Sequence, residues 1–299
     1  MKNKKSFKSG FAAIIGMPNV GKSTLLNTIV GQKIAIISDK PQTTRNKILA
    51  IYSTDEEQII FTDTPGIHKP HNKLGEYMVH VANESMVDTD VLIFVVDASK
   101  KIQETEREIA KNISKTGLPC ILVLNKVDLM KKEDLLPIIA DYSSMHDFAS
   151  IVPVSAKNND GVDILLHDIE DYLEEGPEFY DSDMVTDQPE KQIAAEIIRE
   201  KLLWLLDKEV PHGIAIEITK MQEKEKITNI YATIYCEKAS HKGIIIGKHG
   251  EMLKKIGTMA RGDIEKMLDK KVYLVLWVKV KSDWRNSDFL IKNFGFTNE

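Results

Sequence analysis

The sequence of 299 residues contains only two cysteines, Cys120 and Cys236, and they lie far apart. A disulfide framework or a cysteine metal site needs several cysteines at short, regular spacings, so both are excluded. The sequence also lacks any apolar run near the roughly 18 residues that a membrane-spanning helix needs. These absences indicate a reducing compartment, and we expect a cytoplasmic protein.

The chain has no strong excess of charge of either sign. Its 40 Lys and Arg residues and 45 Asp and Glu residues give a net charge of −5. This balance excludes a uniformly basic protein that coats nucleic acid, although a sum can hide local imbalance. With 42% hydrophobic and 28% charged residues, the chain should be globular, and its length favours about two domains.

The most informative stretch is residues 16–23, Gly-Met-Pro-Asn-Val-Gly-Lys-Ser, which fits the phosphate-binding pattern G-x-x-x-x-G-K-S/T. An apolar run at 11–15 predicts the preceding strand, and residues 24–30 predict the following helix. The glycines let backbone N–H groups turn toward a phosphate, and the helix start adds partial positive charge. We expect Lys22 to reach the β- and γ-phosphates and Ser23 to bind Mg²⁺. The residues expected along the phosphates are Gly16, Met17, Pro18, Asn19, Val20, Gly21, Lys22, Ser23 and Thr24.

Two later segments gain meaning from this loop. Thr43 and Thr44 lie in a polar, proline-containing loop at 39–45, where a nucleotide switch would place an Mg²⁺-binding hydroxyl. Asp63, Thr64, Pro65, Gly66 and Ile67 follow a predicted strand at 58–61. An aspartate at a strand end can hold Mg²⁺ directly or through water, and the Gly66 N–H can approach a γ-phosphate. Alone, each segment would be an ordinary turn.

The sequence Asn125-Lys126-Val127-Asp128 after an apolar strand at 119–124 predicts the identity of the base. The Asp128 carboxylate can accept hydrogen bonds from N1–H and the 2-amino group of guanine. Adenine offers neither donor and would leave the buried charge unpaired, at a cost of several kcal/mol. We expect Asn125 to tie this loop to the phosphate loop and the Lys126 stem to cover the base. Further along, Ser155, Ala156 and Lys157 follow a short strand, and the Ala156 N–H is expected on guanine O6. The predicted ligand is therefore GTP or GDP.

The order of elements predicts the architecture. Strands alternate with helices through residues 1–175, which predicts a doubly wound α/β sheet with its ligand at the strand carboxyl ends. Residues 176–189 form an acidic, proline-containing linker within a stretch that has no Lys or Arg from 174 to 190.

The remaining residues, 190–299, predict a smaller α+β domain in the order α-β-β-α-α-β. Its first helix should start near Asp187, whose side chain can act as the cap. The other expected elements are strands at 214–219, 230–236 and 272–280, helices at 242–246 and 251–268, a charged turn at 220–226 and a closing helix at 283–294.

Between the two inner helices of this second domain lies Gly247-Lys248-His249-Gly250. That placement predicts a KH domain (type II), whose Gly-x-x-Gly loop clamps about four single-stranded nucleotides. Residues 241–285 carry eleven Lys or Arg against five acids, a local charge of +6 that suits phosphate binding. The central Ile244-Ile245-Ile246 is expected in the core. The residues expected on RNA are Lys242, Gly247, Lys248, His249, Gly250, Lys254, Lys255 and Arg261.

Together these motifs resemble the translation-factor class of GTPases, and with the KH domain the chain resembles the Era family from Phe11 onward. Residues 243–258 match that family's pattern closely. The resemblance implies a slow GTPase that acts in 30S ribosomal subunit assembly and binds the single-stranded 3′ end of 16S rRNA. It implies Mg²⁺ held by Ser23, Thr44 and Asp63, with Thr44 favoured over Thr43. It also implies peripheral association with the cytoplasmic membrane, and we expect a monomer.

One departure concerns the attacking water. Ras-like GTPases carry a glutamine just after Asp-x-x-Gly to orient that water, whereas this chain has Ile67, which cannot. Hydrolysis must then depend on the phosphate loop, metal ions, backbone groups or a partner. In related enzymes the loop asparagine, here Asn19, helps hold a K⁺ ion, so the expected catalytic residues are Lys22, Thr44 and Asn19. Because Ile67 cannot orient water, an alternative also remains, an RNA chaperone in which the nucleotide is mainly structural.

Overall fold

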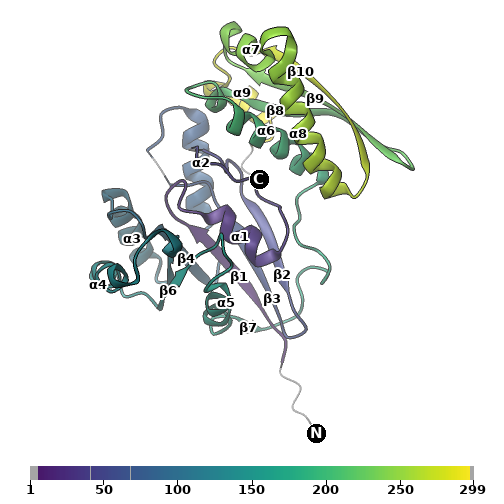
Figure 1. The fold of residues 1–299 in the computed structure, drawn as a ribbon. Coiled ribbons are helices and arrows are strands. Elements are labelled where there is room, and N and C mark those ends of the chain that lie inside the picture. The colour runs from purple at the N-terminus through teal and green to yellow at the C-terminus, as the bar shows by residue number, and fades with distance from the viewer. Residues whose placement is uncertain (1–5, 41, 68, 297–299) are drawn as a thin grey trace. The chain divides into compact units, whose positions relative to one another are not determined.

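The computed structural model describes residues 6–40, 42–67 and 69–296; Pro41, in the predicted polar loop, lies outside them. The chain divides into two units (Figure 1). The first comprises Met1–Ala35, Thr44–Lys69 and Met78–Asp187, and the second comprises Ile36–Thr43, Pro70–Tyr77 and Gln188–Glu299. Two short segments from the first 175 residues, 36–43 and 70–77, therefore pack with the C-terminal part of the chain.

The first unit is built on one sheet in the order β2-β3-β1-β4-β5-β6. Strand β2 is antiparallel to β3, whereas β3, β1, β4, β5 and β6 are parallel neighbours. The doubly wound α/β prediction is confirmed, and the carboxyl ends of the parallel strands meet at one edge of the sheet. The strands are β1 (Lys8–Ile15), β2 (Ile48–Ser53), β3 (Glu57–Asp63), β4 (Val91–Asp97), β5 (Cys120–Asn125), β6 (Ser150–Val154) and β7 (Glu174–Glu175), which pairs with β1.

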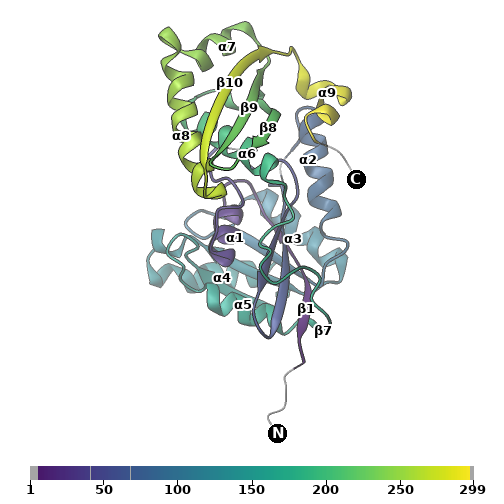
Figure 2. The ribbon, with the colours of Figure 1, turned by 90° about the vertical axis from the view of Figure 1, so that its right-hand side faces the viewer.

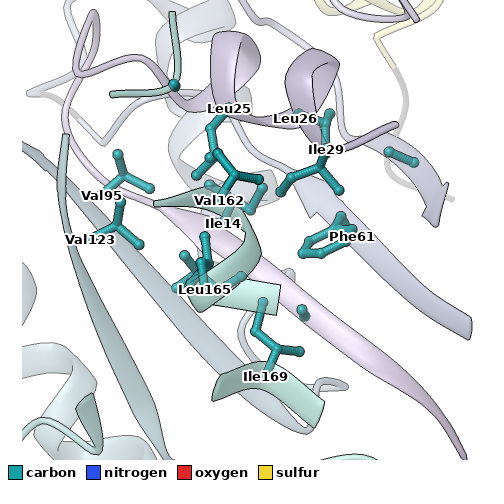
Figure 3. Close-up of a cluster of buried hydrophobic side chains, with 14 of the residues drawn as sticks. Ile14, Leu25, Leu26, Ile29, Phe61, Val95, Val123, Val162, Leu165 and Ile169 are labelled. Carbon is teal, nitrogen blue, oxygen red and sulfur yellow. The ribbon is translucent and has the colours of Figure 1, made fainter. Parts of the chain in front are cut away.

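Helices cover both faces of this sheet, and each face has its own core. Ile14 belongs to a cluster with Leu25, Phe61 and Leu165 (Figure 3), whereas the next residue, Ile15, belongs to the opposite cluster. Successive residues of β1 are thus buried on alternate faces, as expected for an inner parallel strand. The helices are α1 (Lys22–Val30), α2 (Lys73–Glu84), α3 (Glu104–Thr116), α4 (Leu135–Ser143), which the sequence analysis missed, and α5 (Val162–Glu170).

The second unit contains a three-stranded sheet in the order β10-β9-β8, with β9 central. Strand β8 is antiparallel to β9 and β10 is parallel to it. Alternate residues such as Ile230, Ile234 and Val278 join Ile198 and Ile256 of the helices in one core. The elements are α6 (Glu190–Leu205), β8 (Ala215–Glu223), β9 (Ile227–Cys236), α7 (Ala239–Ile246), α8 (Glu251–Leu268), β10 (Lys271–Val280) and α9 (Asp288–Asn293). Their order is the predicted KH order.

Three predicted boundaries in this unit were wrong. Helix α6 does not start near Asp187 but at Glu190, because Pro189 is extended and serves as its N-cap. The predicted charged turn at 220–226 is largely strand, since β8 continues to Glu223 with its charged side chains in solvent. The closing helix is interrupted at Ser287, whose side chain caps the short α9.

Both cysteines are buried and free of disulfides. Burial raises the pKa of the Cys120 thiol to about 12, so this thiol is an inert core group. Among the described residues, no helix has the length and apolar character needed to cross a bilayer.

Candidate guanine-nucleotide site and nucleic-acid groove

The phosphate loop is held close to the base-recognition loop. A Cβ atom on Gly21 would lie 2.2 Å from Nδ2 of Asn125, and Gly21 has a φ of +102°, so only glycine fits here. Helix α1 begins at the next residue with no side-chain cap from Gly21. The first N–H groups of α1 are therefore suited to bind an anion.

Three oxygen-bearing side chains meet beside this loop. The Ser23 hydroxyl donates to Asp63 Oδ2 at 2.7 Å, and Thr44 Oγ1 lies 3.0 Å from Ser23 Oγ and 3.3 Å from Asp63 Oδ2. Asp63 is fully buried, and within the described part of the chain its Oδ1 has no hydrogen-bond partner. An orphaned carboxylate oxygen next to two hydroxyls is a donor set that fits Mg²⁺. The Thr43 hydroxyl instead donates to the Lys40 carbonyl at 2.6 Å, which favours Thr44 as the metal residue.

Burial shifts the pKa values of Lys22 and Asp63 in this cluster. Burial lowers the pKa of Lys22 to about 8, and the nearby Asp63 carboxylate only partly opposes this effect. Burial raises the pKa of Asp63, against the opposing effects of Lys22 and of the hydrogen bonds from Ser23 and Thr44. The Lys22 ammonium donates to the carbonyls of Met17 and Gly16, at 2.9 and 3.2 Å. A phosphate at the loop would give this cation a far stronger partner.

Asn125 links three loops. Its link to the phosphate loop is the one that the sequence predicts. Its Nδ2 donates to the Val20 carbonyl at 2.8 Å, and its Oδ1 accepts from the Ala156 N–H at 3.1 Å. Because the Ala156 N–H is already engaged, its contact with guanine O6 stays a prediction. The Ser155 hydroxyl donates to Asp128 Oδ1 at 2.7 Å, which orients the carboxylate expected to bind guanine.

Lys126 is fixed by a residue that the sequence analysis missed. Its ammonium donates to the Asn19 carbonyl and to Asp97 Oδ2, both at 2.7 Å. Although burial raises the pKa of Asp97, hydrogen bonds from Lys126 and Ser99 outweigh it, and the net pKa lies below the usual value. The available signal was an acid at the end of a fully buried strand, β4, at the same edge of the sheet as the other site residues.

The remaining predicted nucleotide residues lie on the same loops. The Ile67 N–H donates to the Gly16 carbonyl at 3.2 Å, which ties the segment after β3 to the phosphate loop. The Thr64 hydroxyl donates to the Ile14 carbonyl at 2.9 Å and is buried, so it supports the loop. The other positions, Pro18, Thr24, Pro65, Gly66 and Lys157, directly follow β1, β3 or β6 or open α1.

In the second unit, buried charges of helix α6 hold Ile37, Gln42 and Thr43. Arg199, Glu200 and Lys201 are consecutive and at most 2% exposed. The Arg199 guanidinium donates to the carbonyls of Gln42 and Thr43, and Glu200 Oε1 accepts from the Ile37 N–H at 3.0 Å. These contacts fix the chain immediately before Thr44. The sequence alone does not predict these contacts, because a charged triplet in an amphipathic helix is usually solvent-exposed.

The Gly-x-x-Gly loop leads into a groove of about 460 Å³. Gly247 has a φ of +75°, and a Cβ there would lie 2.6 Å from Met252 Cβ, so this turn requires glycine. Ile245 is buried, as expected, but Ile244 is half exposed, which corrects the prediction that the whole triplet is core. The groove is lined by Gly250, Leu253, Lys254, Gly257, Thr258, Arg261, Leu274 and Leu276.

Among the predicted RNA residues, Gly250, Lys254 and Arg261 line the groove directly. Lys248 and His249 are exposed on the connecting loop. Lys242 and Lys255 lie on α7 and α8 but do not line the groove. The arrangement combines apolar walls with cations, which suits bases and phosphates together.

The lowered pKa of Lys22 makes nucleotide binding sensitive to pH. Bound phosphate should keep the ammonium protonated, so binding GDP at pH 8 should take up about half a proton. The affinity should correspondingly fall as the pH rises through about 8. Calorimetry in buffers of different protonation enthalpy measures this uptake. Lys22→Arg, which stays protonated, should show none, and zero uptake by the unmodified protein would contradict the assignment.

Asp128→Asn should reverse the preference for the base. The new amide oxygen can still accept from N1–H of either base. The new NH₂ group would face the 2-amino donor of guanine, whereas xanthine presents a 2-oxo acceptor there. We expect GTP affinity to fall by about 100-fold and xanthosine triphosphate to bind better than GTP. Competition binding measures both, with the exposed Asp134→Asn as the matched control. Unchanged guanine selectivity would remove Asp128 from this role.

Comparison with known proteins agrees with this geometry. Residues 11–126 match the model of the 50S ribosome-binding GTPase family, and residues 209–285 match that of the KH domain. GTPase Era of Ruminiclostridium cellulolyticum is 57% identical over 97% of this chain and 98% of its own length. GTPase Era of Clostridioides difficile is 53% identical over 98% of this chain and 100% of its own length.

Solved structures give the same relationship. A variant of Aquifex aeolicus Era bound to GDP·AlF₄⁻ superposes with a TM-score of 0.95 at 40% identity, covering 98% of this chain and all of that chain. Era in complex with MgGDPNP and nucleotides 1506–1542 of 16S ribosomal RNA superposes with the same score, identity and coverage. With its phosphate loop, its guanine-recognition loop and its KH unit in this order, the chain belongs to the Era family of GTPases.

Proposed function

We propose that this GTPase is a switch whose KH unit binds single-stranded 16S rRNA near its 3′ end during assembly of the 30S subunit. The observation that carries the proposal is the presence of two prepared sites in one chain. One is the buried cluster of Ser23, Thr44 and Asp63, and the other is the basic groove beside Gly250. A related Era has been solved with MgGDPNP and nucleotides of this RNA, which supports the same pair of ligands here.

Mg²⁺ would be held by the Ser23 and Thr44 hydroxyls, with Asp63 as a ligand directly or through water. When bound, the ion supplies positive charge to the β- and γ-phosphate oxygens. Lys22 supplies a second positive charge from inside the loop. Ile67 packs against the apolar core and orients no water, so the chain's contribution to hydrolysis is charge and position.

Asn19 is the residue we propose as part of a K⁺ site. It has a φ of +64°, and its carbonyl accepts a hydrogen bond from Lys126, so the loop is fixed at this position. A monovalent cation beside the phosphates would add charge where Ras-like enzymes use an arginine.

GTP turnover should therefore depend on the monovalent cation. We expect hydrolysis in K⁺ to be at least about tenfold faster than in Na⁺, because positive charge at the phosphates accelerates the reaction and the smaller Na⁺ would fit the proposed K⁺ ligands less well. Steady-state phosphate release measures the rate, and Asn19→Ala should reduce the difference between the two ions. Equal rates in K⁺ and Na⁺ would remove this part of the proposal.

The switch would act through residues 36–43. The Thr44 hydroxyl contacts Asp63 in the buried cluster, whereas the carbonyls of Gln42 and Thr43 accept hydrogen bonds from Arg199 of α6. A change in the order of this short segment would therefore alter contacts with the nucleotide at one end. It would also alter contacts with α6, the helix that packs on the KH sheet. We further propose a monomeric cytoplasmic protein with peripheral membrane association, which rests on the family resemblance.

Affinity for an oligoribonucleotide from the 3′ end of 16S rRNA should depend on nucleotide state. We expect tightest binding with a GTP analogue, weaker binding with GDP, and a steep decrease with salt because phosphate contacts dominate. Crosslinking or anisotropy measures this, and Gly250→Asp should reduce binding by at least about tenfold through charge repulsion. Equal affinity in every nucleotide state would instead favour the RNA chaperone that Ile67 keeps open.

A further inference from the structure

The outer face of the KH sheet carries an exposed aromatic cluster. Tyr231 of β9 and Tyr273 and Trp277 of β10 project from the side away from the core; we call these three residues the aromatic face. Tyr273 is 53% exposed and Trp277 is 48% exposed. The Tyr231 ring stacks on Trp277 with centroids 5.9 Å apart and meets Tyr273 edge-on at 6.5 Å.

The same side of the sheet is covered at its other end. Tyr235 packs against Phe294 with ring centroids 4.8 Å apart, and its hydroxyl donates to Glu217 at 2.7 Å. Phe294, which follows α9, therefore covers this side of the sheet at Tyr235, whereas Tyr273 and Trp277 are exposed. Adjacent large aromatic rings left in solvent are typical of a binding surface.

The aromatic face adjoins the proposed RNA groove. Strand β10 is the edge strand of the sheet, and α8 runs beside it (Figure 2). Leu274 and Leu276 of this strand line the groove, whereas Tyr273 and Trp277 project to the opposite side. A strand of RNA that leaves the groove needs to cross only β10 to reach the aromatic rings.

Three lysines flank the aromatic face, whereas the acid Glu217 lies toward the Tyr235 end of the same side. Lys271 and Lys279 lie on the same side of β10 as Tyr273 and Trp277, at either end of this pair. Lys220 of β8 lies opposite Tyr231. Lys271 is 3.8 Å from Glu265, a loose pair that leaves it exposed. Exposed rings with flanking cations form the platform on which proteins stack unpaired bases.

We propose that the aromatic face is a second RNA-binding site, which stacks unpaired bases of the strand that the Gly-x-x-Gly groove clamps. The inference rests on the proposed function, because it extends the path of the same RNA. Trp277 and Tyr273 supply the stacking surfaces, and Lys271 and Lys279 neutralise the phosphates between stacked bases.

The test compares two unstructured RNAs, one of about four nucleotides that fills only the groove and one of about twelve that can reach β10. Trp277→Leu keeps apolar bulk but removes the π-face, and Trp277→Phe keeps a smaller ring. We expect Trp277→Leu to lower the affinity for the long RNA by about tenfold and to leave the affinity for the short RNA unchanged. Trp277→Phe should retain most of the affinity for the long RNA. Gly250→Asp should weaken both RNAs, so failure of the groove is distinguishable from failure of the aromatic face.

Fluorescence gives a direct readout of stacking. The chain has three tryptophans, and in a Trp204→Phe background the remaining ones are Trp277 and the fully buried Trp284. Long RNA should quench the emission and short RNA should not. Equal affinity of Trp277→Leu and the unmodified protein for long RNA would overturn the proposal. So would a Trp277→Leu defect seen only with anionic phospholipid vesicles or a protein partner, which would assign the face to that ligand.

Discussion

The structure depends on one buried carboxylate. Asp63 has no exposure to water, and burial raises the pKa of its carboxyl. Lys22 and the hydroxyls of Ser23 and Thr44 offset only part of the cost of burying a negative charge there. Because these groups come from α1, the end of β3 and the segment before β2, the cluster forms only when all three are in place. A metal-bound nucleotide would add positive charge beside this carboxylate.

In the proposed switch, the second unit would respond to nucleotide through the segment that precedes Thr44. Thr44 belongs to the buried cluster, and the residues just before it are held by Arg199 and Glu200 of α6. Buried charges tolerate little displacement, because removing a partner leaves an uncompensated charge. In the proposed switch, displacing Gln42 or Thr43 would therefore break contacts with a buried charge.

The fold and most of the nucleotide site could be predicted because their signals are local. The Gly21-Lys22-Ser23 spacing and the fully apolar strands before Asn125 need no tertiary information. Asp97 and Arg199 could not be found in this way, since their roles come from partners distant in the sequence. The sequence did not predict the extension of β8 beyond Lys220, because a run of charged residues is typical of a turn but also occurs on a solvent-exposed strand.

In the proposed function, guanine nucleotide and RNA bind to one molecule and each changes the affinity for the other. Coupling free energy is reciprocal, so RNA must alter the affinity for nucleotide if nucleotide alters the affinity for RNA. The most direct measurement is the affinity for a GTP analogue and for GDP, with and without saturating RNA from the 3′ end of 16S rRNA. We expect RNA to increase the affinity for the GTP analogue severalfold more than the affinity for GDP. An identical effect of RNA on both nucleotides would contradict it.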